Sequence, residues 1–304
     1  MKKSLVVIVG PTAVGKSEVA IELAKKINGE IVSCDSRQVY EHLNIGTAKS
    51  TKEERKKIPH HLIDIIKPNE EFNAFLYAQR AHEAISKVHK KKKIPILVGG
   101  SGLYVRAVLN GIFPGAGKNK EIRNRLEKFS SSALYKKLKE TDPKTALRLH
   151  PHDKVRLIRA LEVYELTGQP ISALQKVSKE KKPNYNLMMV GLKRKREELY
   201  QRINKRVEGM IEGGLVEEVR GLLKKGFSKD LIALKGLGYK EIIGYLDREY
   251  GLEEAIRLLK RNSRRFAKRQ LTWFSQDKRI HWIEIAEKDL ANRVASQIAN
   301  MVEC

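Results

Sequence analysis

The chain has 304 residues, 41% apolar and 32% charged, which excludes an intrinsically disordered protein and leaves room for one large domain or two smaller ones. Lysine and arginine number 61 against 36 aspartates and glutamates, a net charge of +25 that is typical of proteins with a polyanionic partner such as nucleic acid. The chain has two cysteines, Cys34 and Cys304, which lie far apart in the sequence and support neither a disulfide framework nor a zinc site. We expect a cytoplasmic protein with no membrane span.

The first 113 residues alternate between strand and helix patterns. The expected strands are Leu5–Val9, Glu30–Ser33, Ile63–Ile66 and Ile94–Val98, and the expected helices are Gly15–Ile27, Phe72–His89 and Leu103–Leu109. This alternation predicts an α/β fold with a parallel sheet, whose strands all end at one edge.

The pattern changes after a glycine- and proline-containing break at Phe113–Gly117. Residues 120–176 read as wholly helical, and Asn186–Leu192 restores a strand pattern. Helices are expected at 196–224, 239–248 and 253–274, and a last strand at His281–Ile285. With the phosphate-loop segment GPTAVGKS at 10–17 following the first strand, this organisation predicts a P-loop NTPase-like core domain at 1–114 and 184–304, with a helical C-terminal part, and a helical insertion domain at 115–183.

The segment GPTAVGKS at 10–17 follows the first strand and matches the phosphate-binding pattern G-x-x-x-x-G-K-[ST]. Gly10 and Gly15 permit close backbone approach to a phosphate, Lys16 adds a positive charge, and the Ser17 hydroxyl can ligate Mg²⁺. The strand at Ile94–Val98 ends in glycines rather than in an aspartate, which argues against a motor or a GTPase but leaves a kinase open.

Asp35 follows the second strand, at the edge of the sheet where ligands bind. Its carboxylate could ligate Mg²⁺ through water or accept a proton from a nucleophile. Because Asp before Ser-Arg-Gln also suits a helix N-cap, the pattern alone leaves both readings open.

Eight segments carry a family resemblance over residues 4 to 275. They are GPTAVGKS, SCDSRQVYEHLNIGTAK, PHHLID, LVGGSGLYVRAVLNG, RLIRALEVYELTG, GLVEEVR, LKGLGYKE and AKRQLTWF. Together they resemble the bacterial tRNA dimethylallyltransferases, also called tRNA isopentenyltransferases or IPP transferases. The resemblance implies transfer of a dimethylallyl group from its diphosphate to N6 of the adenosine immediately 3′ of the anticodon, in tRNAs reading codons that begin with U. A monomer with Mg²⁺ is expected.

The resemblance also implies roles for individual residues. The donor site would comprise Gly10, Thr12, Ala13, Val14, Gly15, Lys16, Ser17 and Arg220. Asp35 would take the proton from N6, with the Ser101 hydroxyl beside it. Contacts to tRNA would come from Asp35, Ser36, Arg37, Gln38, Ser101, Arg123, Arg159, Ala160, Leu161, Glu162, Val163, Lys235, Gly238 and Tyr239.

Residues 260–269, called the basic run below, contain six basic residues and no acid. Their spacing predicts one positive stripe on a helix, suited to a row of phosphates; it includes Arg264, Arg265 and Lys268 as further tRNA contacts. The insertion is expected to act as a clamp on the anticodon stem-loop, hinged near 113–117 and 183.

Two alternatives to the transferase function remain open from the sequence. They are a small-molecule or nucleoside kinase that uses ATP, and a P-loop RNA-binding protein without transferase activity.

Overall fold

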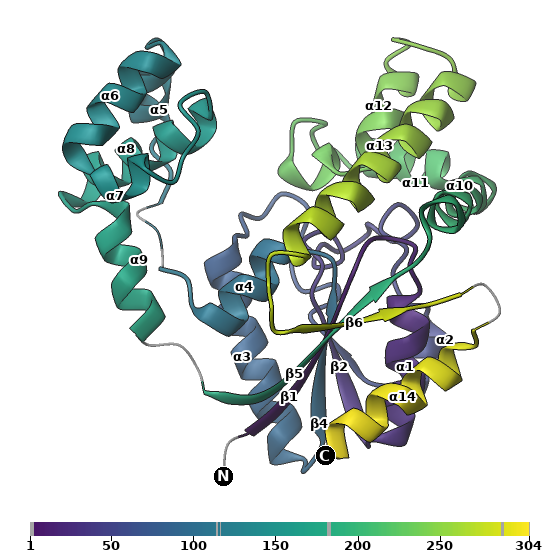
Figure 1. Cartoon of the computed structure of the whole chain (residues 1–304). Coiled ribbons are helices and arrows are strands. Elements are labelled where there is room, and N and C mark those ends of the chain that lie inside the picture. Colours follow the sequence, from purple (N-terminus) through teal and green to yellow (C-terminus); the bar gives the residue numbers. More distant parts are fainter. Residues whose placement is uncertain (1–2, 114, 116, 181–183, 287–288, 304) are drawn as a thin grey trace. The chain divides into compact units, whose positions relative to one another are not determined.

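The computed structural model describes residues 3–113, 115, 117–180, 184–286 and 289–303. The chain divides into two compact units (Figure 1). The first comprises Met1–Asn73, Gln79–Val105 and Asn184–Cys304, and the second Ala74–Ala78 and Arg106–Pro183. The predicted α/β fold with a parallel sheet, a helical insertion and a helical C-terminal region is confirmed.

The sheet of the first unit has six strands in the order β3-β2-β4-β1-β5-β6, and every neighbouring pair is parallel. The strands are β1 (Lys3–Val9), β2 (Gly29–Ser33), β3 (His60–His61), β4 (Ile94–Gly99), β5 (Tyr185–Lys193) and β6 (Ile280–Glu284). Strands covered by helices on both faces are apolar throughout, which is why the short apolar runs predicted β1, β2, β4 and β5.

The predicted strand at Ile63–Ile66 is wrong. The third strand is shorter and earlier, at His60–His61, and Ile66 forms only an isolated parallel bridge with Tyr40. Leu62 and Asp64 have φ angles of 65° and 55°, so the chain leaves the extended conformation directly after β3.

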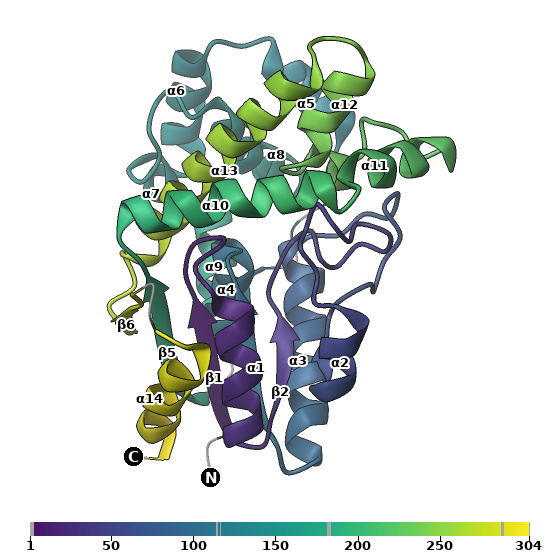
Figure 2. The same ribbon diagram turned by 90° about the vertical axis from the view of Figure 1, so that its right-hand side faces the viewer.

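Helices cover both faces of this sheet (Figure 2). On one face α1 (Lys16–Lys26) packs beside α14 (Ala291–Glu303), and α3 (Ala74–Lys90) lies on the other, with α4 (Gly102–Asn110) following β4. The core beneath α1 and α14 includes the fully buried Ile8, Leu23 and Ile298. A short α2 (Lys52–Lys57) precedes β3.

The remaining helices of the first unit lie beyond the carboxyl ends of the strands (Figure 2). They are α10 (Arg196–Glu212), α11 (Leu215–Lys224), the 3₁₀ turn η1 (Ile232–Lys235), α12 (Tyr239–Leu246) and α13 (Leu252–Phe274). The region predicted to be helical over 196–224 is helical, but it forms two helices, because Gly214 has a φ of 92° and separates α10 from α11.

The second unit is helical and has its own apolar core. Its helices are α5 (Lys120–Glu127), α6 (Ser131–Thr141), α7 (Pro143–Ala146), α8 (Lys154–Thr167) and α9 (Ile171–Glu180). Leu126, Leu138, Leu157 and Leu161 are buried between them. Of the predicted hinge positions, Pro114, Ala116 and Pro183 lie outside the described residues. Among the described residues, no helix is long and apolar enough to cross a bilayer.

Candidate active site

The phosphate loop joins β1 to α1 and closes over Lys16. Gly10 and Gly15 have φ angles of 141° and 110°, a region that disfavours other residues. A Cβ atom at Gly10 would lie 2.5 Å from the carbonyl oxygen of Leu192 in β5, so the loop packs directly on that strand. The Lys16 ammonium group donates to the carbonyl oxygens of Gly10 at 3.0 Å and Pro11 at 2.7 Å.

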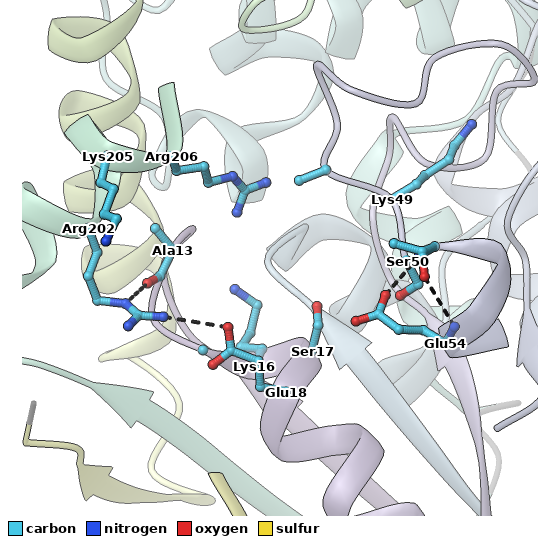
Figure 3. Close-up of a pocket in the computed structure, with 13 residues that line it drawn as sticks. Ala13, Lys16, Ser17, Glu18, Lys49, Ser50, Glu54, Arg202, Lys205 and Arg206 are labelled. Atoms are coloured by element: carbon cyan, nitrogen blue, oxygen red, sulfur yellow. Dashed lines mark hydrogen bonds and ion pairs between the residues drawn. The ribbon is translucent and has the colours of Figure 1, made fainter. Parts of the chain in front are cut away.

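A pocket of about 540 Å³, called the phosphate pocket below, opens over this loop (Figure 3). Its cationic lining consists of Lys16, Lys49, Arg202, Lys205 and Arg206. Both of its carboxylates have partners: Glu18 lies 3.6 Å from Arg202, and Glu54 accepts the backbone N–H of Thr51 at 2.8 Å. The pocket is therefore suited to an anion with several negative charges.

The cations of the phosphate pocket perturb one another. Burial of the Lys16 ammonium group and the nearby Arg206 guanidinium lower the pKa of Lys16 to about 7, against the opposing effect of Asp35. Burial also lowers the pKa of Arg206, and Asp35 again acts in the opposite direction. An anion bound between Lys16 and Arg206 would relieve this repulsion.

Helix α10 brings to the loop two arginines that the sequence did not predict as ligands. The Arg202 Nε donates to the Ala13 carbonyl oxygen at 2.9 Å, and Arg206 lines the phosphate pocket one helical turn further on. Just before α10, the Arg194 Nε donates to the Val14 carbonyl oxygen at 3.1 Å. The only local signal was the i, i+4 spacing of Arg202 and Arg206 on a predicted helix.

A second pocket, of about 290 Å³, is called the acceptor pocket below. It shares Ala13 and Arg206 with the phosphate pocket, so the two adjoin at the phosphate loop. Its polar lining includes Asp35 and Ser101. Its apolar lining comprises Ile203, Val207, Met210, Leu237, Leu259 and Phe266. A molecule bound there would meet apolar surface and a carboxylate together.

Asp35 and Ser101 line the same pocket because β2 and β4 are neighbours in the sheet. The Ser101 Oγ accepts the backbone N–H of Ser36 at 3.0 Å, which ties the loop after β4 to the loop after β2. The Asp35 Oδ1 accepts the backbone N–H groups of Arg37 at 2.8 Å and Gln38 at 3.4 Å. Among the described residues none donates to Oδ2, and Asp35 lines the acceptor pocket.

A residue that sequence analysis missed links α13 to both loops of the site. Gln270 is 6% exposed; its Oε1 accepts the backbone N–H of Thr12 at 2.8 Å, and its Nε2 donates to the Gly100 carbonyl oxygen at 2.9 Å. The phosphate loop and the loop that carries Ser101 are thus fastened to one helix. The contact from Gln270 to Thr12 spans 258 positions, so no local pattern predicts it.

Arg220, predicted at the donor site, is not brought there. It pairs with Glu217 on the same helix and is absent from the described residues that line either pocket. Its neighbour Glu218 instead accepts the backbone N–H of Ile45 at 2.8 Å and the Tyr239 hydroxyl at 2.7 Å.

The predicted tRNA residues of the second unit gather around one buried carboxylate. Glu162 is fully buried; Arg123 donates to it from Nε at 2.7 Å and from a terminal nitrogen at 2.8 Å, and Arg159 donates at 2.6 Å. The side chains of Ala160, Leu161 and Val163 lie in the interior. A contact of these three with tRNA would therefore be indirect in this conformation.

The other predicted tRNA residues lie in the first unit. Lys235 lines the acceptor pocket, whereas Gly238 and Tyr239 are buried at the start of α12. In the basic run on α13, Arg264 donates to the Asn204 side chain at 2.7 Å, while Arg265 and Lys268 are exposed. The run therefore has one edge packed on α10 and another open to solvent.

No cluster of three or more His, Cys, Asp or Glu side chains that could hold a metal ion occurs among the described residues. Ser17 lies in the first turn of α1 and lines the phosphate pocket (Figure 3). One hydroxyl suits Mg²⁺, which is commonly held by few protein ligands together with phosphate oxygens and water.

Comparison with known proteins gives one consistent result. A family model described as IPP transferase matches residues 38–277. A protein named tRNA dimethylallyltransferase from Halothermothrix orenii is 50% identical over 303 residues, covering 98% of this chain and 92% of that protein. One of the same name from Pelotomaculum thermopropionicum is 49% identical, with coverages of 99% and 97%.

Solved structures agree with the sequence matches. The structure of the full-length tRNA isopentenylpyrophosphate transferase from Bacillus halodurans is similar with a TM-score of 0.73 at 43% identity, covering 99% of this chain and 97% of that one. A eukaryotic dimethylallyltransferase, described as acting on tRNA, is similar with a TM-score of 0.82 at 30% identity, with coverages of 98% and 77%.

Proposed function

We infer the function of this chain from its family, because the chain belongs to the IPP transferases. It acts as a tRNA dimethylallyltransferase, moving a dimethylallyl group from dimethylallyl diphosphate to N6 of the adenosine 3′ of the anticodon. A kinase that uses ATP is not favoured, because the relatives matched over nearly the whole chain are transferases.

The observation that best supports the assignment of the site is the adjacency of the two pockets. If the diphosphate group of dimethylallyl diphosphate occupies the cationic phosphate pocket, the allylic carbon of the donor would lie near Ala13 and Arg206, where the acceptor pocket begins. The apolar side chains there suit a five-carbon prenyl chain and the face of a flipped adenine. We propose that Lys16, Arg202 and Arg206 bind the diphosphate. The role of Arg220 at the donor stays a prediction.

The reaction needs a proton acceptor and a stabilised leaving group. As N6 forms a bond to the allylic carbon, the carbon–oxygen bond to diphosphate breaks and its electron pair leaves with the diphosphate. We propose that Asp35 takes the proton from N6 and that Lys16 and Arg206 stabilise the charge on the leaving diphosphate. Ser101 accepts an N–H from Ser36, which leaves its own O–H to donate to a ligand in the acceptor pocket.

Mg²⁺ is proposed at the Ser17 hydroxyl, with diphosphate oxygens completing its coordination. Bound there, it would neutralise charge on the diphosphate and make it a better leaving group. Chelation is expected to abolish transfer, and titration with Mg²⁺ to restore it.

We propose that tRNA contacts the exposed Arg265 and Lys268 together with Lys235, and that Arg123 and Arg159 contact it from the second unit. The clamp role of the helical insertion, the monomeric state and a cytoplasmic location are proposals as well. Light scattering of the purified chain tests the monomer.

The direct test is incubation of the chain with labelled dimethylallyl diphosphate and an anticodon stem-loop, followed by nucleoside analysis. Label on the adenosine 3′ of the anticodon is expected, and ATP should not replace the donor. Asp35→Asn is expected to lower kcat by about 10²- to 10⁴-fold, with tRNA binding mostly retained. Transfer at the wild-type rate by Asp35→Asn would refute the role of this carboxylate.

A further inference from the structure

One carboxylate of the first unit receives four hydrogen bonds and belongs to neither pocket lining. The Oε2 of Glu218 accepts the backbone N–H groups of Asn44 at 3.0 Å and Ile45 at 2.8 Å. Its Oε1 accepts the backbone N–H of Gly46 at 3.2 Å and the hydroxyl of the fully buried Tyr239 at 2.7 Å. Four donors match the number of lone-pair sites of an ionised carboxylate.

The segment that Glu218 holds runs along both pockets. Residues 44–51 are called the strap below. Gly46 and Thr47 line the acceptor pocket, and the residues from Ala48 to Thr51 line the phosphate pocket. Three consecutive N–H groups directed at one carboxylate fix the backbone at the start of the strap.

The strap in turn contacts the catalytic centre. The carbonyl oxygen of Thr47 accepts Gln38 Nε2 at 3.2 Å and a terminal nitrogen of Arg206 at 3.5 Å. The backbone N–H of Gln38 donates to Asp35, and its Oε1 accepts the Ser33 hydroxyl at 2.8 Å. A continuous series of contacts thus leads from Glu218 to the proposed base, Asp35.

We propose that Glu218 is a positioning residue, which fixes the strap and thereby the wall of the acceptor pocket and the orientation of Asp35. The inference rests on the proposed function. A carboxylate is required because both oxygens accept. A glutamine would turn its NH₂ toward one pair of donors and leave that pair without an acceptor.

Glu218→Gln tests this role, with Glu217→Gln as the matched control. Glu217 is the preceding residue of α11, it is exposed, and its ion-pair partner is Arg220. Because the start of the strap faces the acceptor pocket, Glu218→Gln is expected to lower kcat/KM for tRNA about 10- to 100-fold, while KM for dimethylallyl diphosphate changes less than about threefold. Glu217→Gln should stay within about twofold of wild type.

Two further measurements separate positioning from loss of folded protein. Hydrogen exchange at the amides of residues 44–46 should accelerate in Glu218→Gln while exchange in the strands stays slow. Tyr239→Phe, which removes only one of the four donors, should give a smaller loss of the same kind.

The inference is overturned if Glu218→Gln keeps the wild-type kcat/KM for tRNA. It is also overturned if kcat/KM falls equally for tRNA and for dimethylallyl diphosphate, and only in proportion to the fraction of the variant that is folded. These outcomes differ from failure of the proposed function, which would show as no transfer by the wild-type chain.

Discussion

Asp35 occupies a position that is compatible with both readings that its sequence context left open. Its Oδ1 caps a turn by accepting the N–H groups of Arg37 and Gln38, as an N-cap aspartate does, although no helix follows. The same side chain lines the acceptor pocket beside Ser101. The turn fixes one carboxylate oxygen and therefore the direction of the other. A local capping pattern and a place at the end of a parallel strand are compatible, which is why the sequence could not separate them.

Lys16 gives the first prediction. Its pKa of about 7, caused by burial and by Arg206, leaves it mostly neutral at pH 8. A bound diphosphate favours the protonated amine and raises this pKa, so binding at pH 8 should take up a proton. With a pKa of about 7 in the free protein, donor affinity should fall by up to about 25-fold from pH 7.5 to pH 9, a range in which the diphosphate itself is fully ionised.

Calorimetry in two buffers of different ionisation enthalpy measures this proton uptake. Lys16→Arg is the control, because a guanidinium stays protonated throughout this range and should make any remaining binding independent of pH. Finding no proton exchange with the wild-type chain at pH 8 would show that Lys16 does not change its protonation state when the donor binds, and would contradict this prediction.

At the scale of elements, the sequence predicted what depends on local pattern. The apolar runs located β1, β2, β4 and β5, and their shared parallel direction placed the phosphate loop, Asp35 and Ser101 at one edge. What it did not predict depends on packing between distant segments: Gln270 on Thr12, and Arg202 on Ala13. In a chain with 61 basic residues, two arginines spaced by four do not stand out as ligands.

Helix α8 carries the second prediction, on the stability of the helical unit. Burial alone would raise the pKa of Glu162, but hydrogen bonds from Arg123, Arg159 and the Asn119 N–H outweigh it and lower this pKa to about 2. Since the pKa is below that of the unfolded chain, the stabilisation is complete at neutral pH and is lost as the pH falls from about 4.5 toward 2.

Glu162→Gln should therefore lower the free energy of unfolding by about 2–4 kcal/mol at pH 7, measured by thermal or urea unfolding, and lose this effect near pH 2. The control is Glu165→Gln in the same helix, whose partners Arg125 and Lys137 are more than half exposed, so less than about 1 kcal/mol is expected. Equal losses in the two variants would contradict the special role of the buried carboxylate.

For the molecule as a whole, the net charge of +25 matters through its placement. Within the first unit, Arg269 at the end of the basic run lines the acceptor pocket, and Arg265 and Lys268 lie exposed on the preceding turn. A phosphate backbone that follows the run would be led to the pocket that must admit the adenine. Lys90, by contrast, is the last residue of α3, and Lys91 and Lys92 follow it before β4 starts, at the opposite edge of the sheet.

The salt dependence of tRNA binding separates these two groups of charge. If Arg265 and Lys268 each neutralise one phosphate, replacing either by alanine should reduce the slope of log K against log salt by about 0.7–0.9, and replacing both by about twice that. Lys90→Ala removes the same charge at the far edge and should leave the slope unchanged, because counterions are released only where phosphates are contacted. Fluorescence anisotropy of a labelled anticodon stem-loop over several salt concentrations measures the slopes. Similar decreases in all the single variants would mean that tRNA responds to the total charge of the protein, and α13 would then have no special part in guiding it.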